Sequence, residues 1–407
     1  MPEPQPPKNR WFMMALLTAI ATFVAALPSS CMPPLFKEIG DDLGLDLVQI
    51  GSIWGIASLS GIFVFIIAGV LSDRLNLKLV IGISCVLVGI TGALRGLSGT
   101  FFALAVTVFI NGIIRLVVPV SVTKTVGMLF KGRNLGLAQG IGAMGMGFGL
   151  MLGPLISATL ISPWLGGWRN VMYFYGGLSV FIGIVWLIFG HTPARTETPE
   201  DTAEKAPVKE IFLNLIHNKA VWLLGAMLFF RTASLMGVTG YVPTYLKNLG
   251  WTVGSADSAL TVFYAGSTLF VVFFASISDK LGSRKAILFT GIVTSFIAIS
   301  FIPFASGAAV IILMIFSGLF MDGFMAIFTT MLLETEGVGH KYSGTAIGVV
   351  FTIAQLGSVI SPPIGNGLAA YGHQWPFLLW AALGAVALIP FFFTKETARH
   401  LKALKVR

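Results

Sequence analysis

The sequence predicts an all-α membrane protein in which twelve transmembrane helices form two related bundles of six. The first observation is composition: of 407 residues, 56% are hydrophobic and only 11% are charged, whereas a soluble protein averages about 25% charged residues. The second is that the apolar residues fall into twelve separate runs, and the third is that the last six runs repeat features of the first six. Lipid must therefore cover much of the apolar surface.

Each apolar run is long enough to cross a bilayer, whose hydrocarbon core needs about 20 apolar residues per helix. Backbone groups in lipid must bond within their own segment, which favours helices over open strands. The spans divide the chain into an N-terminal bundle (1–190), a polar linker (191–218) and a C-terminal bundle (219–407). The predicted spans are 11–36, 48–72, 79–98, 101–129, 135–162, 170–190, 219–246, 255–278, 285–306, 309–333, 343–371 and 375–394.

The basic residues are unevenly distributed along the chain, which predicts its orientation. If both termini are inside, the cytoplasmic segments hold 19 of the 26 Lys and Arg residues, and basic residues prefer that side. We therefore expect a multi-pass protein of the cell (inner) membrane with both termini in the cytoplasm. This imbalance explains the net charge of +9 without nucleic acid as a partner. The outer segments hold only Lys37, Arg95, Arg169 and Lys247.

The sequence shows no pattern typical of an enzyme. The two cysteines form no framework, and the five histidines lie in tails, loops or helix ends without metal-ligand spacing. No nucleophile–base arrangement is present either. We therefore expect no catalytic site, no cofactor and no metal, and we expect a monomer embedded in the lipid bilayer.

The two halves repeat each other, which predicts a transporter. Residues 136–160 match 344–368 without a gap at an offset of 208, and FING at 109–112 matches FMDG at 320–323. A third match, of 69–78 with 275–285, pairs Asp73 with Asp279. Two bundles related in this way, with a site at mid-membrane between them, describe a secondary transporter.

The loop after the second span of each half completes a resemblance to the major facilitator superfamily, and the resemblance covers nearly all of the chain. In that family the loop reads G-x-x-x-D-R/K-x-G-R-K/R. The first copy departs from the pattern, with Asn76 and Leu77 where glycine and arginine are usual. The resemblance implies that these loops latch the inner helix ends in the outward-facing state, and that the first latch is the weaker one. The matching residues are Gly69, Asp73, Arg74 and Lys78, and then Asp279, Lys280, Gly282, Arg284 and Lys285.

Glycines recur along the fifth span. The segment from Gly149 to Pro154 resembles the antiporter motif of the family. However, Gly145, Gly149 and Gly153 are spaced four residues apart, which makes a smooth stripe that lets another helix approach closely. We favour this packing interpretation and infer no antiport from the motif.

Only three charged side chains lie well inside a predicted span: Arg115, Arg231 and Asp322. A charge at the bilayer centre costs roughly 2.5–3.5 kcal/mol on insertion scales, so it normally faces a cavity or a partner. The resemblance implies that the first, fourth, seventh and tenth helices line a central cavity. The three charges fall on the fourth, seventh and tenth spans, so we predict that they belong to a binding site between the halves.

The internal repeat adds Asn111 to this predicted site. Asn111 in FING occupies the position of Asp322 in FMDG, and Arg115 follows Asn111 by one helical turn. These side chains are therefore expected to face one space, which Arg231 reaches from the seventh helix. Tyr241 and Gln355 are further candidates for its wall; the alternatives are an interfacial aromatic and a packing residue, respectively.

Glu334 lies at the inner end of the tenth span. Either it is a solvated loop residue, or it forms an inner-gate salt bridge with Lys124 or Lys131.

Two guanidinium groups and one carboxylate sum to one positive charge, which predicts a small monovalent anion as the substrate. The planar fork of arginine binds a carboxylate with two parallel hydrogen bonds. An empty site is expected to hold an Arg–Asp pair that leaves one arginine free. Two alternatives stay open: a purely structural ion pair with a neutral substrate, and a multidrug or hydrophobic-cation exporter in which Asp322 binds the cargo.

Asp322 is also the best candidate for proton coupling. If the substrate captures the arginines, the carboxylate loses its partners and can take up a co-transported proton. Within the superfamily, arginines on the fourth and seventh helices resemble the organic-anion branch, and TGYVPTYLKNLG at 239–250 resembles cyanate-permease-like porters. That branch commonly has a basic residue on the first helix. Here there is none before Lys37, which favours a substrate with one negative charge.

Overall fold

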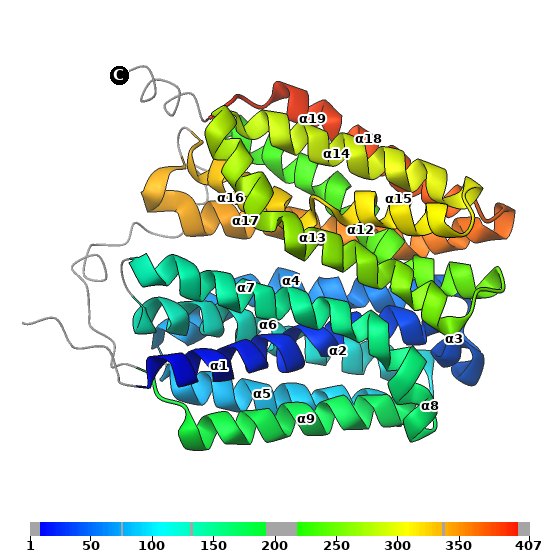
Figure 1. Cartoon of the computed structure of the whole chain (residues 1–407), viewed down its shortest axis with the longest axis horizontal. Coiled ribbons are helices and arrows are strands. Elements are labelled where there is room, and N and C mark those ends of the chain that lie inside the picture. The colour runs from blue at the N-terminus through cyan, green and yellow to red at the C-terminus, as the bar shows by residue number, and fades with distance from the viewer. Residues whose placement is uncertain (1–8, 75, 131–132, 193–217, 336–337, 398–407) are drawn as a thin grey trace, which may run out of the picture. The chain divides into compact units, whose positions relative to one another are not determined.

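The computed structural model describes residues 9–74, 76–130, 133–192, 218–335 and 338–397, in which helices are joined by short connections (Figure 1). The chain folds as two compact units. Unit 1 consists of Met1–Leu45 with Phe63–Ala203, and unit 2 consists of Asp46–Ile62 with Glu204–Arg407. One helix, α4 (Leu47–Arg74), therefore contributes to both units. Most of the predicted linker lies outside the described residues.

Unit 1 contains the helices predicted for the N-terminal half. Polar side chains cap two of them: Asn76 accepts a hydrogen bond from the Lys78 backbone N–H at the start of α5, and Thr100 accepts one from Ala103 at the start of α6. Such caps satisfy backbone donors that have no partner inside the helix. Besides α4, the elements are α1 (Arg10–Ile20), η1 (Ala21–Ala26), α2 (Leu27–Ser30), α3 (Met32–Leu43), α5 (Leu77–Leu94), η2 (Arg95–Leu97), α6 (Phe101–Leu129), α7 (Arg133–Ile156), η3 (Ser157–Ile161), α8 (Ser162–Leu165) and α9 (Trp168–Phe189).

Unit 2 contains the helices predicted for the C-terminal half, again with capped starts. Asn218 accepts from the Ala220 N–H at the start of α12, and Ser283 accepts from Ala286 at the start of α14. The elements are α12 (Lys219–Asn248), α13 (Val253–Leu281), α14 (Arg284–Phe301), η4 (Ile302–Phe304), α15 (Ala308–Gly318), α16 (Met321–Leu333), α17 (Gly339–Gly367), η5 (Leu368–Tyr371), α18 (Trp375–Val386) and α19 (Leu388–Phe393).

The helices have the length and apolar character of membrane spans. Among the described residues, eleven helical segments are long and apolar enough to cross a bilayer, and α4 adds the shorter apolar segment Leu47–Ile62. Large apolar side chains also point outward: on α5, Ile83, Leu87, Ile90 and Leu94 are all exposed. A soluble protein would not expose such a stripe. The prediction of an all-helical, multi-pass membrane protein is therefore confirmed, and α4 lies where the second span was predicted.

Several of the predicted spans are not continuous α-helices, and the first, fifth and tenth are interrupted within their length. The first span contains the π-helix η1 and the fifth contains the π-helix η3, a form that occurs mostly as single turns within α-helices and often at functional sites. The tenth span ends one helix at Gly318 and begins the next at Met321. There, Ser267 of α13 accepts the backbone N–H of Asp322 at 2.9 Å. A side chain of a neighbouring helix thus satisfies a donor at the start of α16.

The glycine stripe of the fifth span packs against the first span. A Cβ atom added at Gly149 would clash with the Thr22 carbonyl and with Ala26. The close approach lets Thr22 Oγ1 donate to the Gly145 carbonyl at 2.8 Å. The packing interpretation of these glycines is therefore confirmed.

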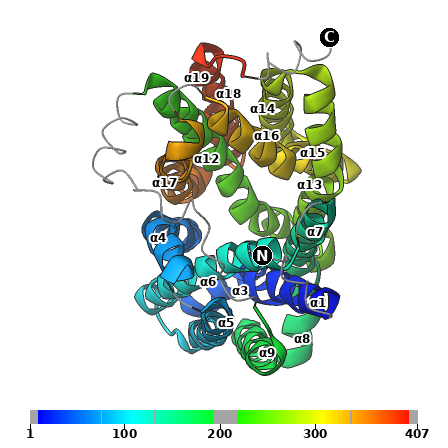
Figure 2. The same cartoon turned by 90° about the vertical axis from the view of Figure 1, so that its left-hand side faces the viewer.

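Helices α5 and α9 pack side by side along much of their length (Figures 1 and 2). They meet at two glycines, Gly89 and Gly176. A Cβ atom on Gly176 would lie 2.6 Å from the Gly89 carbonyl oxygen and 2.8 Å from Ala93 Cβ. Neither backbone nor Cβ atoms can move aside without separating the helices.

The substitution Gly176→Ala is expected to destabilise unit 1 by about 1–3 kcal/mol, the usual cost of overpacking a well-packed site. The neighbouring substitution Gly177→Ala is a matched control, because nothing lies within 4 Å of a Cβ atom there. Thermal unfolding of the detergent-solubilised variants measures the difference. Equal melting temperatures for the two variants would contradict the close contact between α5 and α9.

Candidate functional site

Arg115 lies on α6, fourteen residues after its first residue Phe101. At about 1.5 Å per residue, this is roughly 21 Å along the helix and near mid-membrane. The guanidinium Nη1 donates to the Ala25 carbonyl of η1 at 3.3 Å. No Asp or Glu occurs in any of the six predicted spans of the N-terminal half. The charge is therefore met by a backbone carbonyl and not by a carboxylate of these spans.

Arg95 is a second arginine inside unit 1, and its role was not predicted. Its place directly after an apolar run indicates an outer-loop residue, but the structure buries it to 3% exposure. Nε donates to the Gly92 carbonyl at 3.2 Å, and Nη1 donates to the Pro28 carbonyl at 3.4 Å. Nη2 has no hydrogen-bond partner within the described part of the chain.

Arg231 of α12 is buried in unit 2, where its charge lies on an aromatic ring. Its Cζ atom is 3.7 Å from the centroid of the Phe324 ring on α16. Nε and Nη2 have no hydrogen-bond partner among the residues that the structure describes. A cation–π contact of this kind contributes about 0.5–2 kcal/mol. It leaves hydrogen-bond donors of Arg231 available.

Asp322 occupies the first turn of α16, where the helix N-terminus favours a negative charge. The Ser267 hydroxyl of α13 donates to Asp322 Oδ2 at 2.6 Å. Arg231 interacts with this carboxylate electrostatically, but the two do not form a direct ion pair. The expected Arg–Asp pair is thus not formed between these two residues, because Ser267 and the helix start already stabilise the carboxylate.

Asn111 was expected to face the same space as Arg115. Its side chain is buried against α5, where its Nδ2 donates to the Val88 carbonyl and to Thr91 Oγ1, both at 3.0 Å. Both hydrogens of the amide nitrogen are therefore used within unit 1. This contact joins α6 to α5 and leaves the amide nitrogen without a free donor for a substrate.

The two wall candidates both lie in unit 2. The Tyr241 ring is buried in an aromatic cluster and packs within 5.9 Å of the Tyr245, Phe377 and Trp380 ring centroids. Gln355 of α17 covers Gly61 of α4, so its side chain contacts that helix. The packing of Tyr241 favours a structural role, and a role in substrate binding stays a prediction for both residues.

Arg284 lies at the predicted cytoplasmic end of unit 2 and pairs with Glu334 at 3.3 Å. Arg284 also donates to Ser278 Oγ at 3.2 Å, and Glu334 accepts from Thr397 Oγ1 at 2.7 Å. The start of α14 is therefore bound to the end of α16, and the end of α16 is bound to the chain after α19. Lys280 lies exposed at the same end of α13.

The gating roles predicted for Arg284, Glu334 and Lys280 stay predictions. The partner of Glu334 seen here, Arg284, belongs to the same unit. The side chains of Asp73, Arg74 and Asp279 lie outside the described residues.

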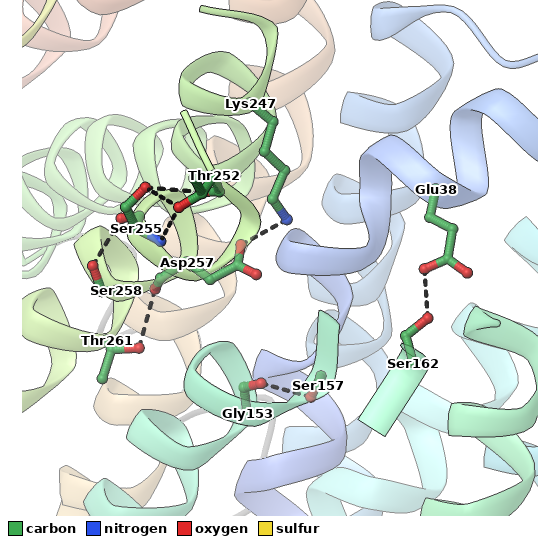
Figure 3. A network of polar contacts seen from close by, with 10 residues as sticks. All are labelled: Glu38, Gly153, Ser157, Ser162, Lys247, Thr252, Ser255, Asp257, Ser258 and Thr261. Carbon is green, nitrogen blue, oxygen red and sulfur yellow. Dashed lines mark hydrogen bonds and ion pairs between the residues drawn. The ribbon is translucent and has the colours of Figure 1, made fainter. Parts of the chain in front are cut away.

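Lys247 and Asp257 form a buried ion pair that was not predicted (Figure 3). Lys247 Nζ lies 2.7 Å from Asp257 Oδ1, and the two side chains are only 6% and 0% exposed. Lys247 is near the end of α12 and Asp257 near the start of α13, so each position indicates a helix end and not a buried charge. Opposite charges on either side of a short turn between two spans were the available signal.

Carboxylates of α3 connect the outer segments of unit 1. Glu38 accepts from Ser162 Oγ at 2.7 Å (Figure 3) and from the Trp168 backbone N–H at 2.6 Å. Asp42 accepts from Trp168 Nε1 at 3.0 Å and from Arg169 Nη1. These hydrogen bonds from Trp168 and Arg169 hold the pKa of Asp42 below its ordinary value. The start of α9 is thus fixed to the segment that follows the first span.

The fold and the buried charges define a membrane transporter built of two helical units. The sequence pattern of the Major Facilitator Superfamily matches residues 18–260 and 227–406. The chain belongs to this superfamily.

Two curated relatives are similar to parts of the chain. The sialic acid transporter NanX of Escherichia coli is 24% identical over 232 residues, 55% of this chain and 55% of NanX. The quinolone resistance protein NorA of Staphylococcus aureus is 27% identical over 179 residues, 42% of this chain and 44% of NorA. The matched segments thus span about half the length of these two relatives.

The fold is also similar to a solved structure. A bacterial homologue of the human lysosomal transporter Spinster has a TM-score of 0.77 at 15% identity, covering 98% of this chain and 99% of that one. At this identity the likeness supports the fold alone.

Acidification is expected to weaken the contact between α3 and α9. Because the pKa of Asp42 is lower in the folded state, its stabilising contribution is full above the unfolded pKa of about 3.9. It is lost as the pH falls through the lower folded value. Melting temperatures in detergent between pH 3 and 7 should therefore converge for wild type and Asp42→Asn at the acidic end.

The substitution Asp41→Asn is the matched control for this pH series. Asp41 pairs only with Lys37 on the exposed side of α3, at 3.3 Å, and exposed ion pairs contribute little. Parallel pH profiles for wild type and Asp42→Asn would contradict the role assigned to Asp42.

Proposed function

We propose that the protein is a secondary active transporter of a small monovalent anion, with an organic carboxylate as the favoured class. The observation that carries this proposal is Arg115, a guanidinium near mid-membrane in a half whose spans contain no acid. A buried charge is costly unless it is paired. An anionic substrate would supply the missing negative charge.

The surroundings of Arg231 support the same proposal for unit 2. Its contact with Phe324 leaves Nε and Nη2 without acceptors among the described residues. Arginine presents its donors as a planar fork that matches a carboxylate. Together, Arg115, Arg231 and Asp322 carry one net positive charge, which one negative charge on the substrate would neutralise. We propose that both arginines contribute to anion binding during the transport cycle.

Asp322 is the proposed proton carrier, and transport is proposed to be proton-coupled uptake. Its carboxylate interacts with Arg231 without a direct ion pair, so an anion bound to Arg231 would weaken the influence of that cation on it. A carboxylate that loses a nearby positive charge binds a proton more readily. Uptake through the cell (inner) membrane, with both termini cytoplasmic, completes the proposal.

The similarity to NanX supports an anionic cargo, since the substrate in that relative's name is an acid. The similarity to NorA favours a second candidate, export of drugs or hydrophobic cations. In that case Asp322 would bind the cargo, and Arg115 would tolerate substitution by an uncharged residue. The two candidates predict opposite ligand charges.

A thermal-shift screen of the purified protein distinguishes the two candidates. Carboxylates, cyanate, nitrate and phosphate esters are tested beside lipophilic cations. We expect an anion to raise the melting temperature, and we expect Arg115→Gln and Arg231→Gln each to weaken its binding about ten- to a hundredfold. This range corresponds to one charge-assisted hydrogen bond, about 1.5–3 kcal/mol.

The substitution Arg10→Gln is a matched control for these two variants, because Arg10 lies over the Phe130 ring at the start of α1. It should leave the anion affinity unchanged. Stabilisation by lipophilic cations alone would overturn the anion proposal and favour export of cations.

The substitution Asp322→Asn tests the coupling in proteoliposomes. We expect the variant to exchange substrate across the membrane at near wild-type rates but to lose accumulation driven by an inward proton gradient, because amide nitrogen cannot carry the proton. Uptake of labelled substrate with and without the gradient measures both properties. If Asp322→Asn still accumulates substrate against its gradient as wild type does, Asp322 is not the coupling residue.

A further inference from the structure

Arg95 and Arg115 lie close together inside unit 1, although they come from different helices. Arg95 binds the Pro28 carbonyl and Arg115 binds the Ala25 carbonyl. These two acceptors are three residues apart on the interrupted first span, which is about one helical turn. The two guanidiniums interact electrostatically, and Cys31 interacts with both.

The two arginines leave unit 1 with excess positive charge. Each is held by backbone carbonyls, which accept hydrogen bonds but carry no net charge. The six predicted spans of this half contain no Asp or Glu. The acids of α3 are used elsewhere: Glu38 binds Ser162 and Trp168, and Asp42 binds Trp168 and Arg169. Two adjacent cations without a carboxylate favour an anion between them.

The hydrogen-bond donors show where such an anion would bind. The carbonyls occupy Nε and Nη1 of Arg95, and Nη2 remains without a partner among the described residues although it is buried. Gly92 lies beside this atom, and a Cβ atom added there would be 3.4 Å from Nη2, an ordinary van der Waals distance. A purely structural brace would not need an unsatisfied, buried donor.

We propose that Arg95 and Arg115 form one oxyanion site within unit 1, and that Arg95 is a substrate-binding residue. The ligand class is a small organic carboxylate, whose two oxygens accept hydrogen bonds from two guanidiniums. This inference rests on the proposed function, and it adds Arg95 as a substrate contact that the proposed function does not include. It also means that the first span contributes its carbonyls as anchors that hold both arginines in place.

The test is a double-mutant cycle on the full-length protein in detergent. Sodium lactate, sodium benzoate and sodium N-acetylneuraminate are titrated, with sodium chloride at equal ionic strength as the reference. Arg95→Gln and Arg115→Gln should each weaken carboxylate binding about ten- to a hundredfold. Because both act on one anion, the double variant should lose less than the product of the two single effects.

Two further variants separate binding from structure. Arg95→Lys keeps the charge but lacks both the free Nη2 donor and the two carbonyl bonds that hold Arg95 in position, so it should bind carboxylates several-fold more weakly than wild type. Arg169→Gln is the matched control, since Arg169 lies at the outer end of the same unit and has Asp42 as its partner. Its carboxylate affinity should equal that of wild type.

The outcomes distinguish this inference from the proposed function. If no carboxylate stabilises the wild type, the proposed function fails and this inference fails with it. If carboxylates stabilise the wild type, and bind both Arg95→Gln and Arg95→Lys as tightly as they bind the wild type, only the inference is overturned. A lower melting temperature of Arg95→Gln with unchanged affinity would show a structural brace and would likewise overturn it. Independent, multiplicative effects of Arg95 and Arg115 would exclude a shared site.

Discussion

The cost of placing a guanidinium in a low-dielectric bundle is the constraint on which the rest of the structure depends. A charge at the bilayer centre needs a partner or a polar cavity, and Arg95, Arg115 and Arg231 meet this need in two ways. Arg95 and Arg115 bind carbonyls of the interrupted first span, whereas Arg231 lies on the Phe324 ring. Each arrangement holds the cation in position without neutralising it. The positive charge therefore remains available to a ligand.

The interruptions of the spans follow from the same constraint. A regular α-helix uses its carbonyls internally, but a π-helical turn or a proline changes that pattern. The first span contains η1 and then Pro28, and the carbonyls of Ala25 and Pro28 accept from arginines of neighbouring helices. In the tenth span, the break before α16 places Asp322 at a helix start, where it is stabilised by Ser267. In these two spans, irregular backbone occurs where charge is held.

Much of the fold could be predicted from the sequence, because hydrophobic length, the glycine stripe and the repeat act locally. The charges of Arg115, Arg231 and Asp322 stood out because each interrupts a long apolar run. Arg95, Lys247 and Asp257 did not, because their positions at span ends are typical of solvated residues, and only tertiary packing buries them. Asn111 shows the converse: the repeat aligned it with Asp322, but alignment of backbone positions does not determine which neighbour a side chain contacts. It bonds to α5.

The Lys247–Asp257 pair shows how this chain stabilises a buried charge, and Arg95 and Arg115 differ from it because no carboxylate pairs with them among the described residues. In unit 2 this chain buries a lysine and neutralises it with a carboxylate 2.7 Å away, on the next helix. A buried charge that serves structure alone is expected to have such a partner, because breaking a buried pair costs about 3–5 kcal/mol. Arg115 and Arg95 have no carboxylate on any predicted span of their half, although a single substitution could provide one. A carboxylate of the protein would neutralise the guanidiniums in every state. An anion would then have to break that ion pair before binding, and the free energy lost would offset the free energy gained. On the proposed function, an arginine binds and releases an anion in each cycle, and neutral carbonyls suit it because they position the charge and do not compete for it.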